Sequence, residues 1–359
     1  MPSAAGPIVL LTCGDPAGIG PEVVVKAWAS TPRHTGARLR VVGDAALLNA
    51  VLADRAGLPR LGMRCIDADD GRESAAHTLL VIEPAERASA GIVTGRATAS
   101  GGAAAAAAVL TAAALVRSGR AHALVTAPLH KEALHAAGFD VPGHTELLAR
   151  ECGRAEADVS MMLWLPAVDG PGGLGVVHVT LHEPLARAVA RMTTGGIEQA
   201  GLRLAGLLER LLGRRPRVAV AALNPHGGES GLFGDEESRL VAPAVRGLAA
   251  SGVDVCGPLP ADTLFLRASR GEFDGVVALY HDQGHIPLKL LGMHRAVNIT
   301  LGLPFVRTSV AHGTAFDIVG SGAADPASML AAIDAAVRLV EAGWPVTAAA
   351  ASAAARGHR

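Results

Sequence analysis

Short, almost wholly apolar runs alternate along the chain with longer segments of helical periodicity. Strands are expected at residues 7–11, 39–42, 123–126, 174–179, 218–222 and 276–279. Helical stretches lie between them, for example at 198–212 and 237–250. Short strands that are apolar on both faces are typical of parallel sheets covered by helices on both sides. The pattern therefore predicts an α/β fold with a largely parallel sheet.

Three stretches depart from this alternation. Residues 55–90 are polar with little periodicity, which predicts a surface excursion of low functional content. The run from Gly101 to Val116 is mostly alanine and glycine. We interpret it as a helix packed closely on a sheet, too short and too weakly apolar to span a bilayer. The alanine-rich tail from Ala348 to Arg359 is predicted to fray.

Composition excludes several classes of protein. Of the 359 residues, 50% are hydrophobic and 18% are charged, so a sizeable core is expected and two domains have room to form. The formal net charge is -1 and aromatic residues make up 3%, so no basic or stacking surface for nucleic acid is expected. The four cysteines form no CxxC pair, and the first residues lack the basic head of a signal peptide. We therefore expect a cytoplasmic protein with no nucleic-acid or membrane partner.

The polar segment Tyr280–Lys289 follows directly on the apolar run that ends at Leu279. Open α/β sheets bind ligands just beyond the carboxyl ends of their strands. A histidine such as His281 in that position can ligate a metal, and Lys289 can bind an anion or move a proton. The segment therefore favours an enzyme site over a solvated loop.

Two further polar motifs follow predicted strands in the first half of the chain. Residues 14–22 form a glycine-rich turn before a helix, whose free N–H groups suit an anion. The motif is not GxGxxG, so the usual dinucleotide fingerprint is absent, and a purely structural turn is the alternative. Residues 126–131 and 143–146 supply hydroxyl, histidine and lysine groups fit to grip a phosphate or carboxylate. Lys131 is equally well explained as a solvated helix residue.

Histidines follow several strands in the second half. In strand geometry His178, Thr180 and His182 would share one face. His182, His226 and His281 each lie at or just past a strand, and three neutral imidazoles are a reasonable first shell for a divalent metal. Sequence spacing does not prove that they converge, and a strand histidine that is only hydrogen-bonded in the interior is the alternative.

Farther on, Asn298 and Arg307 carry an amide and a guanidinium suited to an anionic substrate. For Arg307 a surface ion pair is the other interpretation.

Seven motifs together carry a family resemblance. They are GDPAGIGPE, TAPLHK, GHTE, LNPHGGESGLFG, GPLPADT, YHDQGHIPLK and VNITLGLPFVRTS. With them the chain resembles, from about residue 8 to about residue 340, the 4-hydroxythreonine-4-phosphate dehydrogenases of pyridoxal phosphate biosynthesis. The resemblance implies an isocitrate/isopropylmalate dehydrogenase-like architecture of two α/β/α domains with a cleft between them. The domains would be residues 1–145 with 303–359, and residues 146–302, which would carry the metal ligands and the dimer contacts.

The resemblance also implies roles for individual residues in a homodimer with a shared active site. The metal ligands would be His182, His226 and His281, one of them from the partner subunit. The substrate-binding residues would be His144, Thr145, Lys289, Asn298 and Arg307, and Asp262 would lie near the dinucleotide. Catalytic roles would fall to Lys289, His281 and Asp282. The implied cofactors are NAD or NADP and a divalent metal, which is zinc, magnesium or cobalt.

The implied reaction is metal-dependent, NAD(P)-linked oxidation of 4-phosphohydroxy-L-threonine, followed by decarboxylation to 3-amino-2-oxopropyl phosphate. Two departures leave alternatives open. Ala311 stands where the family commonly has aspartate, and GHIPLKLLG resembles a branch that acts on D-threonate or D-erythronate 4-phosphate. A terephthalate dihydrodiol dehydrogenase-like enzyme, a metal-dependent hydrolase and a non-catalytic sensor are further alternatives.

Overall fold

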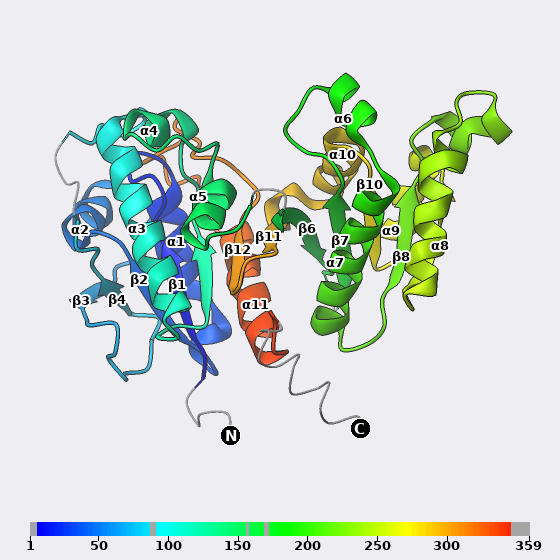
Figure 1. Ribbon diagram of the computed structural model, residues 1–359. Coiled ribbons are helices and arrows are strands. Elements are labelled where there is room, and N and C mark those ends of the chain that lie inside the picture. The colour runs from blue at the N-terminus through cyan, green and yellow to red at the C-terminus, as the bar shows by residue number, and fades with distance from the viewer. Residues whose placement is uncertain (1–5, 87–90, 156–157, 169–171, 346–359) are drawn as a thin grey trace. The chain divides into compact units, whose positions relative to one another are not determined.

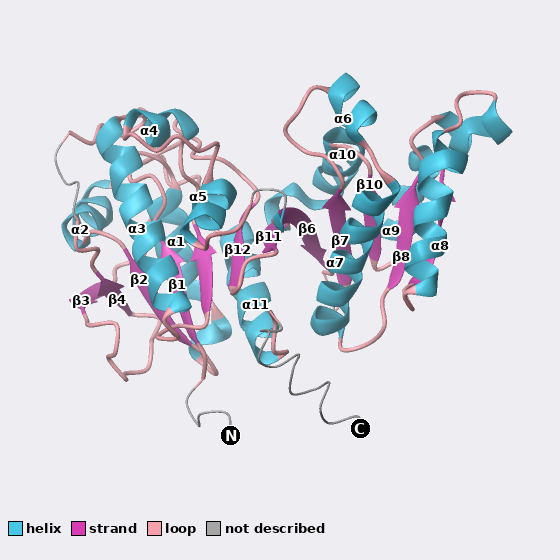
Figure 2. Ribbon diagram, viewed as in Figure 1, coloured by secondary structure: helices cyan, strands magenta, loops and turns pink. Residues whose placement is uncertain are grey.

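The computed structural model describes residues 6–86, 91–155, 158–168 and 172–345. The predicted frayed tail lies outside them. The chain divides into two compact units, Met1–Val159 with Gly302–Arg359 and Ser160–Leu301 (Figure 1). Strands and helices alternate in each unit, so the predicted α/β class is confirmed (Figure 2).

The sequence analysis placed the first junction after residue 145, whereas the structure places it after Val159. The difference comes from helix α5 (His144–Glu151), which packs against helix α3 (Ala99–Arg117) of the first unit.

The first unit contains a parallel sheet in the order β3-β4-β2-β1-β5-β12. Its strands are β1 (Ile8–Thr12), β2 (Arg38–Val42), β3 (Gly62–Cys65), β4 (Thr78–Ile82), β5 (Ala123–Thr126) and β12 (Val306–Val310). The prediction that residues 55–90 are an irregular excursion was wrong, because β3 and β4 extend this sheet. Residues 79–82 of β4 are buried, and this apolar run, as long as those predicted for β5 and β10, was overlooked within a mostly polar segment.

Helices cover both faces of this sheet. They are α1 (Gly20–Ser30), α2 (Ala45–Asp54), α3, α4 (Lys131–Ala136), α5 and α11 (Ala327–Glu341), with the short 3-10 helix η1 (Pro32–His34). Leu10 and Leu124 share a core cluster with α3, whereas the Thr308 hydroxyl donates to the Ala332 carbonyl of α11. Alternate residues of a strand point to opposite faces, so α3 and α11 cover opposite sides.

Helix α3 is the predicted alanine-glycine helix, and its close packing is confirmed. A Cβ atom on Gly102 would lie 2.0 Å from the Ala133 carbonyl oxygen of α4, so only glycine permits this approach. The argument that the run is too short for a membrane was wrong. The helix is 19 residues long, and its length and composition suffice for a span. However, 56% of its most apolar window is buried inside the protein, as in the core helix of a folded domain.

The second unit contains a mixed sheet in the order β11-β6-β7-β10-β8-β9. Its strands are β6 (Ser160–Pro166), β7 (Gly173–His178), β8 (Arg217–Ala221), β9 (Asp254–Leu259), β10 (Gly275–Ala278) and β11 (Val297–Leu301). Strand β6 runs antiparallel to β7 and β11, and the other pairs are parallel. The α-helices are α6 (Leu185–Arg191), α7 (Thr194–Leu212), α8 (Ala242–Ala250), α9 (Ala261–Ser269) and α10 (His281–Gly292). Three short helical segments are η3 (Pro225–Gly231), η4 (Glu237–Val241) and η5 (Met293–Arg295).

Small residues bring the helices of the second unit close to its sheet. Gly175 and Gly275 are in register, and a Cβ atom on Gly275 would lie 2.6 Å from a Leu208 methyl of α7. On the other face, a Cβ atom on Gly284 of α10 would lie 2.8 Å from Val176. Helices α7 and α10 therefore cover opposite faces, and α10 begins where β10 ends.

Asp274 holds together the other end of this sheet. Its carboxylate accepts hydrogen bonds from the Arg214 guanidinium, at 2.7 and 2.9 Å, and from the Arg217 backbone N–H, at 2.8 Å. Burial raises the pKa of this carboxyl, but the hydrogen bonds from Arg214 and Arg217 outweigh burial and lower the pKa to about 2. A pKa lowered in the folded state means that the carboxylate stabilises the fold above about pH 4 and loses this effect as the pH falls through about 2.

Replacement Asp274→Asn should reduce the free energy of unfolding at pH 7 by about 1–3 kcal/mol, because charged hydrogen bonds are lost. The difference from the wild type should shrink between pH 4 and pH 2. Urea unfolding followed by circular dichroism measures both effects. Asp235→Asn is the matched control, because the Asp235–Arg239 pair is exposed and its loss should cost no more than about 0.5 kcal/mol. An undiminished difference at pH 2 would contradict the role of the Asp274 charge.

Candidate active site

A cavity of about 490 Å³ opens at the carboxyl ends of β7 and β10 in the second unit. It is formed by the segment that follows β7 and by the start of α10. Its lining residues are Leu181, His182, Glu183, Pro184, Leu185, Ala188, Tyr280, His281 and Asp282. The cavity thus lies at the sheet edge where parallel α/β sheets bind ligands.

His281 and His182 are neighbours in this cavity, with ring centroids 5.7 Å apart. The Asp282 carboxylate lies 2.6 Å from Nδ1 of His281 and accepts a hydrogen bond from the Nδ1–H group. The free lone pair of the His281 ring is then on Nε2. A carboxylate on one ring nitrogen is the usual support for a histidine that ligates a metal through the other. Three of the residues with predicted site roles are therefore brought together here.

His226 lies on η3, after β8, and its side chain is exposed. Residues 226–230 all have positive φ, including His226 at 53°, Glu229 at 43° and Ser230 at 59°. A positive φ costs a non-glycine residue conformational free energy. Residues with such strained backbones cluster in functional loops. Glu237 anchors the loop by accepting hydrogen bonds from the Leu223 and Asn224 N–H groups, at 2.8 and 2.7 Å. The unusual backbone presents the His226 imidazole to solvent.

The donor chemistry of His182 and His281 fits a divalent cation of the zinc type. Across the described ranges, no three or more His, Cys, Asp or Glu side chains are arranged to hold a metal ion, so His226 does not complete the set within one chain. Two imidazoles are fewer than the three protein ligands of a catalytic zinc site. A catalytic zinc site would therefore need a further ligand besides these two imidazoles.

The prediction that His178, Thr180 and His182 share a strand face was wrong. Strand β7 ends at His178, which is 3% exposed, and the chain then turns. The Thr180 hydroxyl donates to the Leu279 carbonyl at 2.9 Å, and His182 is exposed. The alternation of strand side chains does not extend beyond the last paired residue.

A buried imidazole pair lies behind His281. No role was predicted for His285, whereas for a strand histidine such as His178 the alternative was a hydrogen bond in the interior, which the structure shows. Nε2 of His178 lies 3.0 Å from Nδ1 of His285, and the His285 ring stacks on His281 at a centroid distance of 3.8 Å. Burial, helped by the charges of His281 and Lys289, lowers the pKa of His285 to about 4. Burial also holds the pKa of His178 well below its usual range. The spacing of four residues between His281 and His285 was the available signal, once the motif is recognised as a helix.

The first unit holds a buried cation. Arg307 on β12 is 2% exposed, and Nη2 donates to the Thr126 hydroxyl at 2.7 Å. Burial lowers the pKa of the guanidinium to about 10, and the Glu146 charge opposes this shift, so the group stays protonated at neutral pH. The surface ion pair considered for Arg307 is excluded by this burial.

His144 begins helix α5 beside Arg307. Burial and the Arg307 charge hold the pKa of His144 well below its usual range, so the imidazole is neutral. Its Nε2 atom is buried and has no hydrogen-bond partner among the described residues. Thr145 follows in the first turn of the same helix. A buried guanidinium, an unsatisfied imidazole nitrogen and a helix start together suit a phosphate or carboxylate.

The remaining predicted residues lie on separate elements. Lys289 is exposed on α10, Asp262 is exposed in the first turn of α9, and Asn298 is on β11. The Asn298 side-chain oxygen is buried without a hydrogen-bond partner in the described part of the chain. Ala311 follows β12, and its N–H donates to the Ser328 hydroxyl at 3.1 Å.

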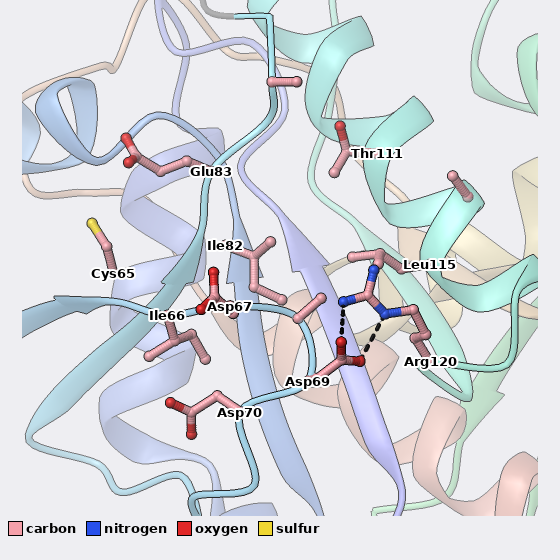
Figure 3. Close-up of a pocket in the computed structure, with 13 residues that line it drawn as sticks. Cys65, Ile66, Asp67, Asp69, Asp70, Ile82, Glu83, Thr111, Leu115 and Arg120 are labelled. Atoms are coloured by element: carbon pink, nitrogen blue, oxygen red, sulfur yellow. Dashed lines mark hydrogen bonds and ion pairs between the residues drawn. The ribbon is translucent and has the colours of Figure 1, made fainter.

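A larger cavity, of about 1040 Å³, lies in the first unit and contains none of the predicted site residues (Figure 3). Four carboxylates line it, those of Asp67, Asp69, Asp70 and Glu83. Arg120 also lines it but pairs with Asp69 at 2.6 Å. This negative lining is unsuited to an anionic substrate, so size alone does not identify the active site.

Comparison with known proteins finds relatives over most of the chain. The family model for the pyridoxal phosphate biosynthetic protein PdxA matches residues 36–336. A D-threonate 4-phosphate dehydrogenase of Pectobacterium atrosepticum is 44% identical, over 92% of this chain and 99% of the relative. The chain belongs to the PdxA family.

Other relatives in the PdxA family carry a second name. A 4-hydroxythreonine-4-phosphate dehydrogenase of Beijerinckia indica is 45% identical, over 92% of this chain and 94% of the relative. The solved structure of a 4-hydroxythreonine-4-phosphate dehydrogenase from Klebsiella pneumoniae matches with a TM-score of 0.80 and 43% identity, over 93% of this chain and 100% of that chain. The predicted family and the predicted oxidoreductase class are confirmed.

Gln283 fixes the start of α10 in this PdxA-family protein. It is 7% exposed, and its side chain accepts from the Leu279 N–H and donates to the Ala222 carbonyl, each at 2.7 Å. The side chain thus ties the carboxyl end of β10 to that of β8.

Replacement Gln283→Leu should lower the free energy of unfolding by about 2–4 kcal/mol, because a buried N–H and a buried carbonyl lose their partners. Chemical denaturation measures the change. The control is Gln199→Ala on the exposed face of α7, for which a change within about 0.5 kcal/mol is expected. Equal stability of the two variants would show that Gln283 does not hold the helix in place.

Proposed function

We propose that the protein is a divalent-metal-dependent, NAD(P)-linked dehydrogenase of a four-carbon 4-phosphate substrate. It would oxidise a secondary alcohol and then decarboxylate the β-keto acid that results. The observation that carries this proposal is the His182–His281 pair, which lines a cavity at the strand ends of a PdxA-family chain. The proposed location is the cytoplasm, in keeping with four free cysteines.

The metal would be held by His182 and His281 of one subunit and by His226 of the partner subunit. Zinc, magnesium or cobalt bound there would polarise the substrate hydroxyl and then favour the enolate that forms as carbon dioxide leaves. The Asp282 carboxylate would orient His281 through its Nδ1–H hydrogen bond.

Other side chains would bind and orient the substrate. The Arg307 guanidinium, Lys289 and Asn298 would hold its anionic ends, with His144 and Thr145 at the phosphate. Lys289 would also move a proton at its Nζ atom when the alcohol is oxidised or the enolate is protonated. A bound dinucleotide would supply the hydride acceptor for the carbon that is oxidised, and Asp262 is proposed to lie near that dinucleotide.

D-threonate 4-phosphate, with D-erythronate 4-phosphate, is the favoured substrate class. Ala311 supplies no carboxylate to pair with the ammonium group of an amino acid. The relatives from Pectobacterium atrosepticum and Cupriavidus necator are named D-threonate 4-phosphate dehydrogenases. The second candidate is 4-phosphohydroxy-L-threonine, with 3-amino-2-oxopropyl phosphate as product, and relatives such as the Beijerinckia indica protein are named for that activity.

Purified protein with a divalent metal and NAD or NADP should form NADH or NADPH from D-threonate 4-phosphate faster than from 4-phosphohydroxy-L-threonine. Absorbance at the reduced-nicotinamide band measures both rates. Ala311→Asp should shift the ratio of kcat/KM toward the amino acid, because it adds a partner for the ammonium group. Phosphate release without reduced nicotinamide would favour the hydrolase alternative, and ligand binding with no turnover would favour the sensor.

We further propose that the protein is a homodimer with two shared sites. One chain holds only two neighbouring imidazoles of the proposed three, and α10 exposes an apolar stripe beside them. Ile286 and Leu290 of α10 and Met293, where η5 begins, are 55%, 82% and 45% exposed and recur at helical spacing. An exposed apolar stripe next to an incomplete site is what a partner subunit would cover.

The dimer proposal predicts complementation between inactive variants. His182→Ala and His226→Ala should each be inactive, because every site loses one ligand. After mixing and subunit exchange, half of the dimers would be mixed, and each would hold one intact site of two, so about a quarter of wild-type activity should return.

The matched control mixes His182→Ala with His281→Ala, two ligands proposed to come from the same subunit. This mixture should stay inactive, because every site keeps one defect. Recovery in the control, or none in the first mixture, would contradict the proposed sharing. Light scattering reports whether dimers form.

A further inference from the structure

The buried pair of His178 and His285 has no role in the proposed mechanism, yet it contacts a proposed metal ligand directly. The His285 ring lies face to face with that of His281, at a centroid distance of 3.8 Å and an interplanar angle of 9°. His178 and His285 are 3% and 7% exposed, so neither ring is a surface group. The pair forms a buried backing for the exposed imidazole.

The sequence builds this backing with a single glycine. His178 is the last residue of β7, and His281 and His285 are one turn apart on α10. A Cβ atom on Gly284 would lie 2.4 Å from Nε2 of His178. Any larger residue at 284 would push α10 away from β7 and separate the two rings.

The hydrogen bonds hold the His285 ring in one orientation. Its Nδ1 atom lies 3.0 Å from Nε2 of His178 and 3.3 Å from the His281 carbonyl oxygen. A carbonyl only accepts, so a proton on Nδ1 of His285 satisfies both neighbours. The His285 ring is then fixed at its edge by His178 and presents its face to His281.

His281 needs such support, because the Asp282 carboxylate that accepts from its Nδ1–H is exposed. The side chains of His281 and Asp282 are 35% and 68% exposed, and hydrogen-bonded pairs at the surface hold orientation weakly. The His285 ring adds a second, buried contact that lies flat against the His281 ring.

We propose that His285 is a positioning residue that fixes the His281 imidazole for metal binding, with His178 holding His285 in place. The proposal rests on the proposed function, in which His281 is a metal ligand. Loss of the backing leaves His281 free to rotate, so each metal-binding event must first immobilise the ring. Loss of the backing therefore weakens metal binding directly. It lowers turnover only because less metal is bound.

The test is zinc binding to the metal-free, full-length protein, measured by calorimetry against a competing chelator. His285→Ala should weaken zinc binding by about 10–100-fold, the range seen when support for a metal ligand is removed. His285→Phe keeps a flat ring against His281 but loses the hydrogen bond to His178, so it should recover part of the affinity. The control is His294→Ala, an exposed histidine on η5, for which unchanged affinity is expected.

Two further measurements separate positioning from packing. The absorption spectrum of bound cobalt should change in His285→Ala and return in His285→Phe, whereas a purely structural defect would lower thermal stability without changing that spectrum. His178→Ala should weaken zinc binding and His178→Gln should restore it, because the amide replaces the hydrogen-bond partner. If His285→Ala does not fold, the two His178 variants test the positioning role in its place.

The outcomes distinguish the two proposals. Wild-type zinc affinity in His285→Ala, together with lost binding in His281→Ala, would overturn the positioning role and leave the proposed metal site standing. If His281→Ala bound zinc with wild-type affinity, the metal would not be bound in this cavity. Both proposals would then be wrong.

Discussion

The position of helix α10 against the ends of β7 and β10 is the constraint on which the second unit depends. Gln283 sets that position, because its amide satisfies one N–H and one carbonyl that would otherwise be buried without partners. Gly284 permits it, because a larger residue would collide with His178. The helix start then places His281 and Asp282 at the mouth of the cavity and His285 behind them. One short segment thus supplies two residues that line the cavity and the buried ring that stacks on one of them.

The first unit shows a different feature, a buried charge on its central sheet. Arg307 is almost fully buried and remains protonated, and the neutral ring of His144 lies beside it. Burying a guanidinium is unfavourable unless an anion or a set of hydrogen bonds compensates. The Thr126 hydroxyl, which accepts from Nη2, and the nearby Glu146 charge supply part of that compensation.

Sequence reasoning succeeded where a local pattern and the fold point the same way. The apolar runs that became β1, β5, β7, β8 and β10 were predicted because they are buried on both faces. It failed where tertiary context changes a local rule. Strand β7 ends at His178, so the alternation expected through His182 stops there. Strand β4 was missed although its run Leu79–Ile82 is apolar and buried, because the polar residues on both sides of it dominate the pattern of residues 55–90.

The sequence by itself determined the α/β class, the family and the identity of the polar segments that follow the strands, because these depend on residue types in local order. Only the tertiary structure decided which of those groups meet. It paired His182 with His281 and buried Arg307 beside His144, and it stacked His285 on His281. It also left His226 outside the pair. Distances between residues far apart in the chain depend on how sheets twist and helices pack, and no spacing along the sequence encodes them.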